Sequence, residues 1–184
     1  MLGSFERNLG SWPPTTSLPW RDRIVKVVKD LSRSVDYLET RDDLCLDRLA
    51  YLGFSWGAAN GPLVLVMESR CRAGVLVSGG LRVKAVAPEV NELAYGPHVR
   101  VPVLMITGRM DEALPLTLQA PFFQHLGSSD KEWILMETGH FLPWKEAVQK
   151  IGVWLDERLP IGAVDRESQP STNRRATLRG PGRP

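Results

Sequence analysis

The stretch LAYLGFSWGAANGPLVLVMES, residues 49–69, decides the fold of this chain. Residues 49–54 form a short apolar run that predicts a buried strand. Residues 56–69 predict a largely apolar helix, which Gly61 and Pro62 would break or kink. Between them lies a G-x-S-x-G motif, residues 53–57, where the strand turns into the helix. This is the structural context in which such a motif presents an exposed serine on a tight turn.

The residue types in this motif have a physical role. A side chain two residues before or after the serine would collide with the adjoining strand or helix, which explains both glycines. The helix that follows directs its N-terminal N–H groups and its positive dipole end at the serine, which favours a developing negative charge. The motif therefore predicts Ser55 as a nucleophile, and a serine hydroxyl needs a general base because it reacts weakly by itself.

Apolar periodicity predicts further elements around this stretch. The predicted helices are 21–40, 116–126 and 144–159, and the predicted strands are 74–77, 101–107 and 133–136. The connection 81–100 is long, and loops of that length are usually functional or mobile. Short apolar strands that alternate with helices indicate an α/β fold, in which helices cover both faces of a mainly parallel sheet.

Three histidines compete for the role of base. His125 falls inside a predicted helix and His98 in the long connection, whereas His140 directly follows the last predicted strand. Because the carboxyl ends of parallel strands lie at one edge of a sheet, we expect His140 to lie near Ser55.

A base of this kind needs a carboxylate that orients it. Asp111 directly follows the third predicted strand, which places it at the same edge of the sheet. Glu112 is its competitor, although its longer side chain, one residue further on, should point elsewhere. After the second strand the nearest carboxylate is Glu89, which is too distant. The sequence therefore favours Asp111.

The chain order Ser, Asp, His is that of the α/β-hydrolases. Residues 21–159 resemble the C-terminal half of such an enzyme, in particular the dienelactone-hydrolase-like and prolyl-oligopeptidase-like branches, which include domains fused to bacterial serine/threonine kinases. The resemblance is carried by DYLETR at 36–41, GFSWG at 53–57, SGG at 78–80, PVLM at 102–105, GRMD at 108–111 and GHF at 139–141.

This resemblance implies a role for each candidate residue. Ser55 would be the nucleophile, His140 the base, Asp111 the acid, and the backbone N–H of Trp56 one donor to the oxyanion. Dienelactone hydrolases carry a cysteine nucleophile, so that the serine here points to esterase or peptidase chemistry. The implied substrate is a small-molecule ester or a peptide, and no cofactor is needed.

The chain departs from the family at its N-terminal side. The family's sheet begins well before its nucleophile, whereas no strand is predicted here ahead of residues 49–54. The loop that supplies the second oxyanion donor is missing with it, and the strand before Ser55 becomes an exposed sheet edge, where self-association or a partner is expected. Two classes of function therefore stay open: a working serine hydrolase, and an inactive hydrolase fragment or interaction module that needs the other half of its sheet.

The amino-acid composition limits the class of protein and the extent of its folded domain. The 184 residues are 43% hydrophobic and 24% charged, which is typical of a globular protein and excludes wholesale disorder. We expect an irregular lead-in at 1–20, a partial α/β-hydrolase domain at 21–160, and a disordered basic tail at 161–184. The tail contains five arginines, Asp165 and Glu167, and so has a net charge of +3. Because the whole chain has a net charge of +2, residues 1–160 have a net charge of −1.

Several classes of partner are not expected. The domain has no cluster of Lys and Arg typical of nucleic-acid binding, and its longest purely apolar run, residues 62–67, is too short to cross a membrane. No secretory signal precedes the domain, so that a cytoplasmic protein is expected. The two cysteines, Cys45 and Cys71, have no partner at metal-ligand spacing, and we expect buried or half-buried thiols and no bound metal.

Overall fold

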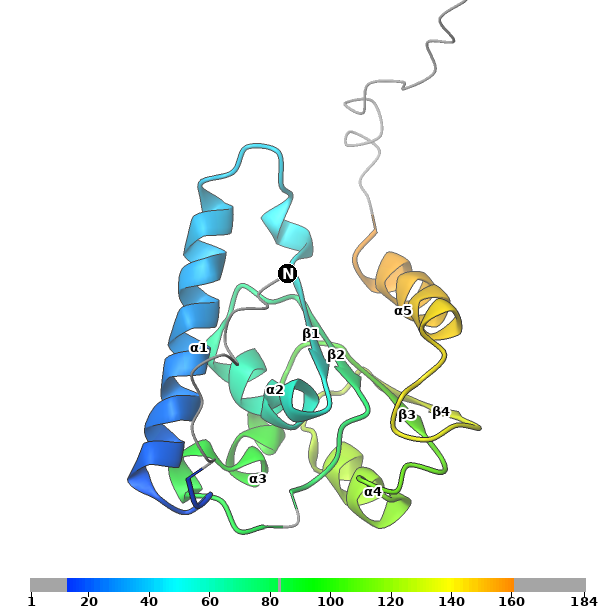
Figure 1. Ribbon diagram of the computed structural model, residues 1–184. Helices are drawn as coiled ribbons and strands as arrows, with labels where there is room; N and C mark the ends of the chain where they lie inside the picture. The colour runs from blue at the N-terminus through cyan, green and yellow to red at the C-terminus, as the bar shows by residue number, and fades with distance from the viewer. Residues whose placement is uncertain (1–12, 83, 161–184) are drawn as a thin grey trace, which may run out of the picture.

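The computed structural model describes residues 13–82 and 84–160, so that the tail at 161–184 and most of the lead-in at 1–20 lie outside the described residues. The elements are α1 (Leu18–Glu39), β1 (Ala50–Phe54), α2 (Trp56–Met67), β2 (Ala73–Val77), α3 (Glu92–Tyr95), β3 (Val103–Gly108), α4 (Leu116–His125), β4 (Lys131–Met136) and α5 (Trp144–Arg158), with 3-10 turns at Leu46–Arg48, Pro88–Val90 and Gly96–His98 (Figure 1). Strands and helices alternate along the chain, as the sequence predicts.

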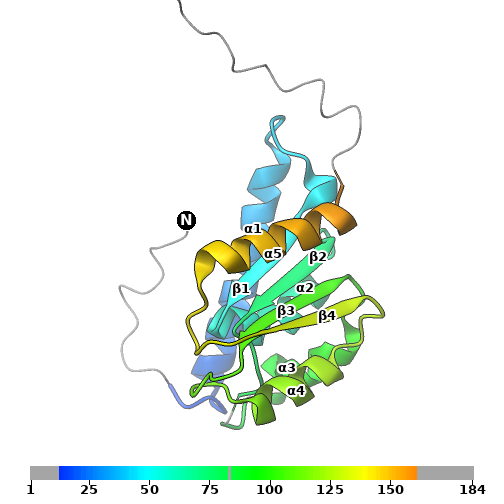
Figure 2. The same ribbon diagram turned by 90° about the vertical axis from the view of Figure 1, so that its right-hand side faces the viewer.

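The four strands form one parallel sheet in the order β1-β2-β3-β4. Helix α5 covers one face of the sheet, and α2 and α4 lie on the other (Figure 2). This arrangement confirms the predicted α/β fold. It also brings the carboxyl ends of all four strands to one edge, where the loops that follow β1, β3 and β4 meet.

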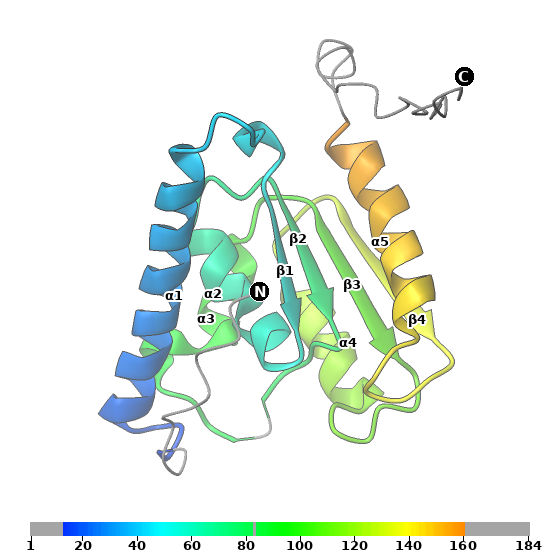
Figure 3. The same ribbon diagram turned by 45° about the horizontal axis from the view of Figure 1, so that its top comes forward.

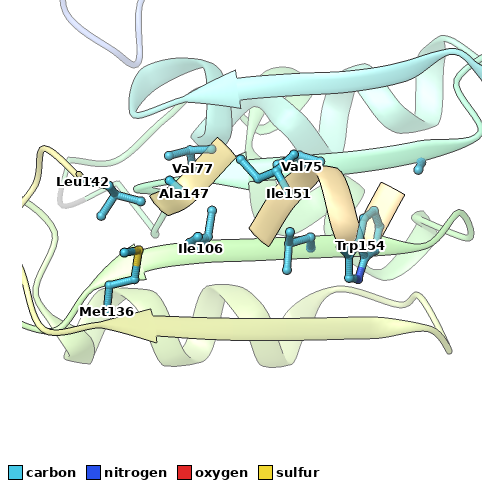
Figure 4. Packing of buried hydrophobic residues seen from close by; sticks show 10 residues of the cluster. Val75, Val77, Ile106, Met136, Leu142, Ala147, Ile151 and Trp154 are labelled. Atoms are coloured by element: carbon cyan, nitrogen blue, oxygen red, sulfur yellow. The ribbon is translucent and has the colours of Figure 1, made fainter. Parts of the chain in front are cut away.

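Burial on both faces explains the composition of the central strands. Every residue of β2 and β3 is buried, and both strands are apolar except for Thr107 near the end of β3. The core beneath α5 joins side chains of β2, β3 and β4 to one face of that helix (Figure 4). Its labelled members are Val75, Val77, Ile106, Met136, Leu142, Ala147, Ile151 and Trp154.

Helix α2 is mainly apolar because it is covered on two opposite sides, and residues 58–65 are all buried. One side packs on the sheet, and the other packs against α1 through Leu63 and Val64, which contact Trp20, Ile24 and Val28 (Figure 3). The helix is continuous through Gly61 and Pro62, so that of the predicted break or kink the break is absent.

Two other details differ from the sequence-based prediction. Helix α1 begins at Leu18, three residues earlier than predicted, because Ser17 caps it: the Ser17 hydroxyl accepts the N–H of Trp20, and Pro19 suits the first turn. The connection 81–100 is not a plain loop, since it contains α3 and two of the 3-10 turns.

Strand β1 lies at the edge of the sheet. Within residues 13–82 and 84–160 it pairs with β2 alone, and no other strand precedes it. Leu52, at the centre of β1, is 50% exposed, whereas the equivalent residues of β2 and β3 are fully buried. Strand β4 lies at the other edge of the sheet, where it pairs with β3 alone among the described residues, and β1 is the edge strand with a half-exposed side chain at its centre.

Candidate active site

Ser55 occupies a sharp turn between β1 and α2. Its φ of 51° and ψ of −107° make it one of two non-glycine residues with positive φ in the described part of the chain. Its N–H donates to the Val77 carbonyl at 2.8 Å, and its own carbonyl accepts the N–H of Ala59 and so begins the helix. A backbone this unfavourable persists only where the surroundings enforce it, and it lifts the side chain out of the sheet edge.

The two glycines of the motif are not equivalent. A Cβ on Gly53 would lie 2.6 Å from the backbone carbon of Gly57, so that no side chain fits there. A Cβ on Gly57 would meet the Tyr51 hydroxyl at 3.5 Å, which is an ordinary contact. The steric argument from the sequence is therefore confirmed at Gly53 and wrong at Gly57. The Tyr51 hydroxyl instead donates to the Gly57 carbonyl at 2.8 Å and ties β1 to the first turn of α2.

The structure brings the three predicted residues together. His140 Nε2 lies 2.8 Å from Ser55 Oγ, and His140 Nδ1 lies 2.7 Å from Asp111 Oδ2. A carboxylate can only accept, so that Nδ1 carries a proton, and in the tautomer with that single ring proton Nε2 accepts the Ser55 hydroxyl. The rival residues lie elsewhere: Glu112 is exposed, and His98 and His125 are exposed, with His125 Nε2 against the Leu93 carbonyl.

The carboxylate of Asp111 is buried and fully bound. Its Oδ1 accepts the backbone N–H groups of Ala113 and Leu114, each at 2.9 Å, while Oδ2 faces His140. Asp111 is 2% exposed. A carboxylate fixed in this way can orient the imidazole without moving itself.

A buried polar chain holds the loop that carries Asp111. Gln119, on α4, donates through Nε2 to the carbonyls of Gly108 at 3.0 Å and Leu114 at 2.6 Å, which are the two ends of this loop. Its Oε1 accepts the Thr107 hydroxyl at 2.7 Å, and Thr107 Oγ1 accepts the Trp133 indole N–H at 2.8 Å. Sequence reasoning missed this network, because a glutamine on a helix has no distinctive local pattern.

The loop that carries His140 is held by two neighbouring strands. Ser78, fully buried at the end of β2, donates its hydroxyl to the His140 carbonyl at 2.7 Å and has a φ of 50°. At the end of β3, a Cβ on Gly108 would come 2.1 Å from the Gly139 carbonyl oxygen, so that only glycine allows the loop to lie this close. Neither residue was predicted as part of the site, although both lie in motifs that carry the family resemblance.

A buried ion pair supports the first turn of α2. Asn60 donates through Nδ2 to the Trp56 carbonyl at 2.8 Å, and its Oδ1 accepts from Arg82. Arg82 in turn pairs with Glu92; the Glu92 side chain is buried and that of Arg82 is 12% exposed. Burial lowers the pKa of the Arg82 guanidinium, whereas the facing Glu92 carboxylate raises it. Trp56, the first residue of α2, is thereby joined to the connection that follows β2, and its N–H lies at the positive end of the helix.

The cysteines and the other titratable groups form no second centre in the described residues. Burial raises the pKa of the Cys71 thiol to about 11, which keeps it protonated, whereas Cys45 is exposed rather than half-buried. Across residues 13–82 and 84–160, no three His, Cys, Asp or Glu side chains are grouped so as to hold a metal ion. None of the described helices is long and apolar enough to cross a membrane.

Comparisons with known proteins give one family match. Residues 20–151 match the family model described as "Serine hydrolase (FSH1)". A search of curated proteins finds no match.

Solved structures show the same fold at low sequence identity. A cold-adapted esterase from an Arctic intertidal metagenomic library is 22% identical with a TM-score of 0.65, over 74% of this chain and 59% of its own. The esterase Pf2001 of Pyrococcus furiosus is 18% identical with a TM-score of 0.62, over 82% and 65% respectively. Dipeptidyl peptidase 4 of Porphyromonas gingivalis is 13% identical with a TM-score of 0.60, over 72% and 22%. The chain thus spans less than two thirds of the length of each of these proteins.

Proposed function

The chain belongs to the serine hydrolase family FSH1, and from this membership we propose that it cleaves an acyl ester, with peptides as the alternative substrate, through a covalent acyl-enzyme. The observation that carries the proposal is the unbroken hydrogen-bonded series from Ser55 through His140 to Asp111. Two of the solved structures with this fold are esterases, and one is a dipeptidyl peptidase.

The geometry supports a mechanism in two half-reactions. Ser55 Oγ attacks the acyl carbon while His140 Nε2 takes the hydroxyl proton, and Asp111 stabilises the imidazolium that forms. The tetrahedral oxyanion develops at the positive end of α2, where the Trp56 N–H serves as a donor. His140 then gives its proton to the leaving oxygen as the C–O bond breaks. Water attacks the acyl-enzyme in the second half-reaction, with His140 again as the base.

A second candidate function follows from the open edge of the sheet. Strand β1 has a half-exposed Leu52 at its centre, and exposed edge strands are sites for pairing with another chain. In this alternative the chain is an inactive hydrolase module that binds another polypeptide beside β1. The enzyme stays the first candidate, because loss of one oxyanion donor lowers turnover by about 10²- to 10³-fold in other serine hydrolases and does not abolish it.

Ester hydrolysis by the purified chain tests the proposal. We expect turnover of p-nitrophenyl acetate above the buffer rate, and its loss in Ser55→Ala. Ser69→Ala is the matched control, since Ser69 is exposed and lies at the far end of α2 from Ser55. A soluble chain with no turnover would favour the second candidate, and turnover that survives Ser55→Ala would contradict the assigned nucleophile.

A further inference from the structure

Three aromatic side chains form a continuous surface beside the site. Phe54 ends β1, Phe141 follows His140, and Trp144 begins α5. The rings of Phe54 and Phe141 are stacked with centroids 5.8 Å apart, and Phe54 and Trp144 are tilted at the same distance. We name Phe54, Phe141 and Trp144 the aromatic platform.

The platform is in contact with water as well as with itself. Phe141 is 75% exposed and Trp144 is 45% exposed, whereas α5 contributes Ala147, Ile151 and Trp154 to the core. Aromatic rings buried in a core need no further partner, whereas the outer surfaces of the Phe141 and Trp144 rings are exposed to solvent. Contiguous exposed apolar groups of this kind mark binding surfaces in globular proteins.

The position of the platform relates it to one side of the reaction. Phe54 directly precedes Ser55, and the rings of Phe54 and Phe141 each lie with centroids 5.4 Å from that of His140. In the proposed mechanism the leaving oxygen must receive a proton from His140 Nε2, which requires hydrogen-bonding distance to that atom. The leaving group therefore passes beside the imidazole that the platform flanks. The acyl group and the oxyanion take the other directions around the tetrahedral carbon.

We infer that the aromatic platform is the leaving-group subsite, and that it takes an apolar alcohol that carries a ring. This inference rests on the proposed function. The acyl C–O bond breaks, the acyl group stays on Ser55 Oγ, the proton of His140 Nε2 goes to the alcohol oxygen, and the ring of the alcohol stacks on Phe141 and Trp144. Aromatic rings prefer such offset or edge contacts, and their burial adds affinity.

A pair of esters that differ only in the alcohol measures the preference for a ring in the leaving group. Ethyl acetate and 2-phenylethyl acetate share the acyl group and have alcohols of similar acidity, so that their ratio of kcat/KM reports the ring alone. We expect a ratio of about ten in favour of the ring, and its loss in Phe141→Ala and Trp144→Ala. Tyr37→Ala is the matched control, since Tyr37 is an exposed aromatic residue on α1 and should keep the ratio. Ethyl phenylacetate, with its ring on the acyl side, should show no comparable dependence on Phe141.

Binding of the product alcohol gives a readout without turnover. In Ser55→Ala protein we expect saturation-transfer NMR to show 2-phenylethanol bound, with the signal lost when Phe141→Ala and Trp144→Ala are added. Binding without any ester turnover in the parent chain would overturn the proposed function, and with it the leaving-group role, and would leave the platform as a binding site for an aromatic alcohol. Ester turnover with no preference for the ring would overturn the subsite. So would binding of 2-phenylethanol that stays the same when Phe141→Ala and Trp144→Ala are added. A dependence on Phe141 that follows the acyl ring instead would assign the platform to the acyl group and refute the inference.

Discussion

Substitution of Ser78 separates two properties that the structure combines in one buried residue. Its hydroxyl holds the His140 carbonyl at 2.7 Å, and its backbone has a φ of 50°. Ser78→Ala loses the hydrogen bond and keeps the strain, and loss of a hydrogen bond of this part-buried kind costs about 1 kcal/mol. Ser78→Gly loses the same bond but releases a Cβ strain of about 1–2 kcal/mol, partly offset by the flexibility of glycine.

The two variants should therefore differ in stability and agree in activity. We expect Ser78→Gly to unfold a few degrees above Ser78→Ala, since about 1 kcal/mol moves the midpoint of a domain this size by roughly 3 °C. Both free the His140 loop, and a displacement of the base by a fraction of an ångström lowers kcat by about 10- to 100-fold with little change in KM. Thermal unfolding and steady-state ester hydrolysis, measured well below either midpoint, give the two quantities.

If Ser78 acts only on stability, the two variants should show a different relation between activity and stability. Activity would then follow stability, and Ser78→Gly would recover most of the wild-type kcat. That result, or a wild-type kcat in Ser78→Ala, would refute the argument that the hydroxyl positions His140. A shift of the His140 imidazole resonances in both variants would support it, because a change confined to stability leaves them in place.

The remaining predictions concern the acid, the motif and the ion pairs. Asp111→Asn should lower kcat by about 10⁴-fold, while Glu112→Gln stays within twofold of wild type; the reverse order would show that the acid is misassigned. Gly53→Ala forces a Cβ against backbone atoms and should lower the unfolding free energy by about 1–3 kcal/mol, so that an unchanged melting temperature would contradict the steric argument. Hydrogen bonds from Arg70 lower the pKa of Glu68 in the folded state, so that this stabilisation is present above the unfolded value of 4.5 and is lost as the pH falls through the folded value. Glu68→Gln should therefore flatten the decline of unfolding free energy in acid, and a decline as steep as that of wild type would rule out this contribution.

The proximity of Ser55, Asp111 and His140 could be predicted because the position of each follows from a local pattern plus one rule of topology. Residues 53–57 encode strand, turn and helix in direct succession, which places Ser55 on the turn at the edge of the sheet. Asp111 and His140 each come just after an apolar strand, and parallel strands place both at the edge that holds Ser55. No long-range contact had to be known for these assignments.

The residues that support the site could not be found in this way. Gln119 acts through hydrogen bonds to two carbonyls and to Thr107, and nothing in the order of residues reveals those partners. Ser78 reaches His140 across 62 positions of sequence. Glycines are easier to interpret, but even there the sequence-based argument required a glycine at both ends of the motif, and only Gly53 is in close contact.

Labelling with a fluorophosphonate tests the central claim most directly, because the probe reacts only with a serine that is already activated by its base. The purified chain, taken as a soluble species from size exclusion, should gain one adduct, located by peptide mapping at Ser55. Ser55→Ala should gain none, and His140→Ala should react far more slowly, since the hydroxyl then lacks its acceptor at 2.8 Å. A folded, soluble chain that gains no adduct, or one that is labelled elsewhere, would contradict the account.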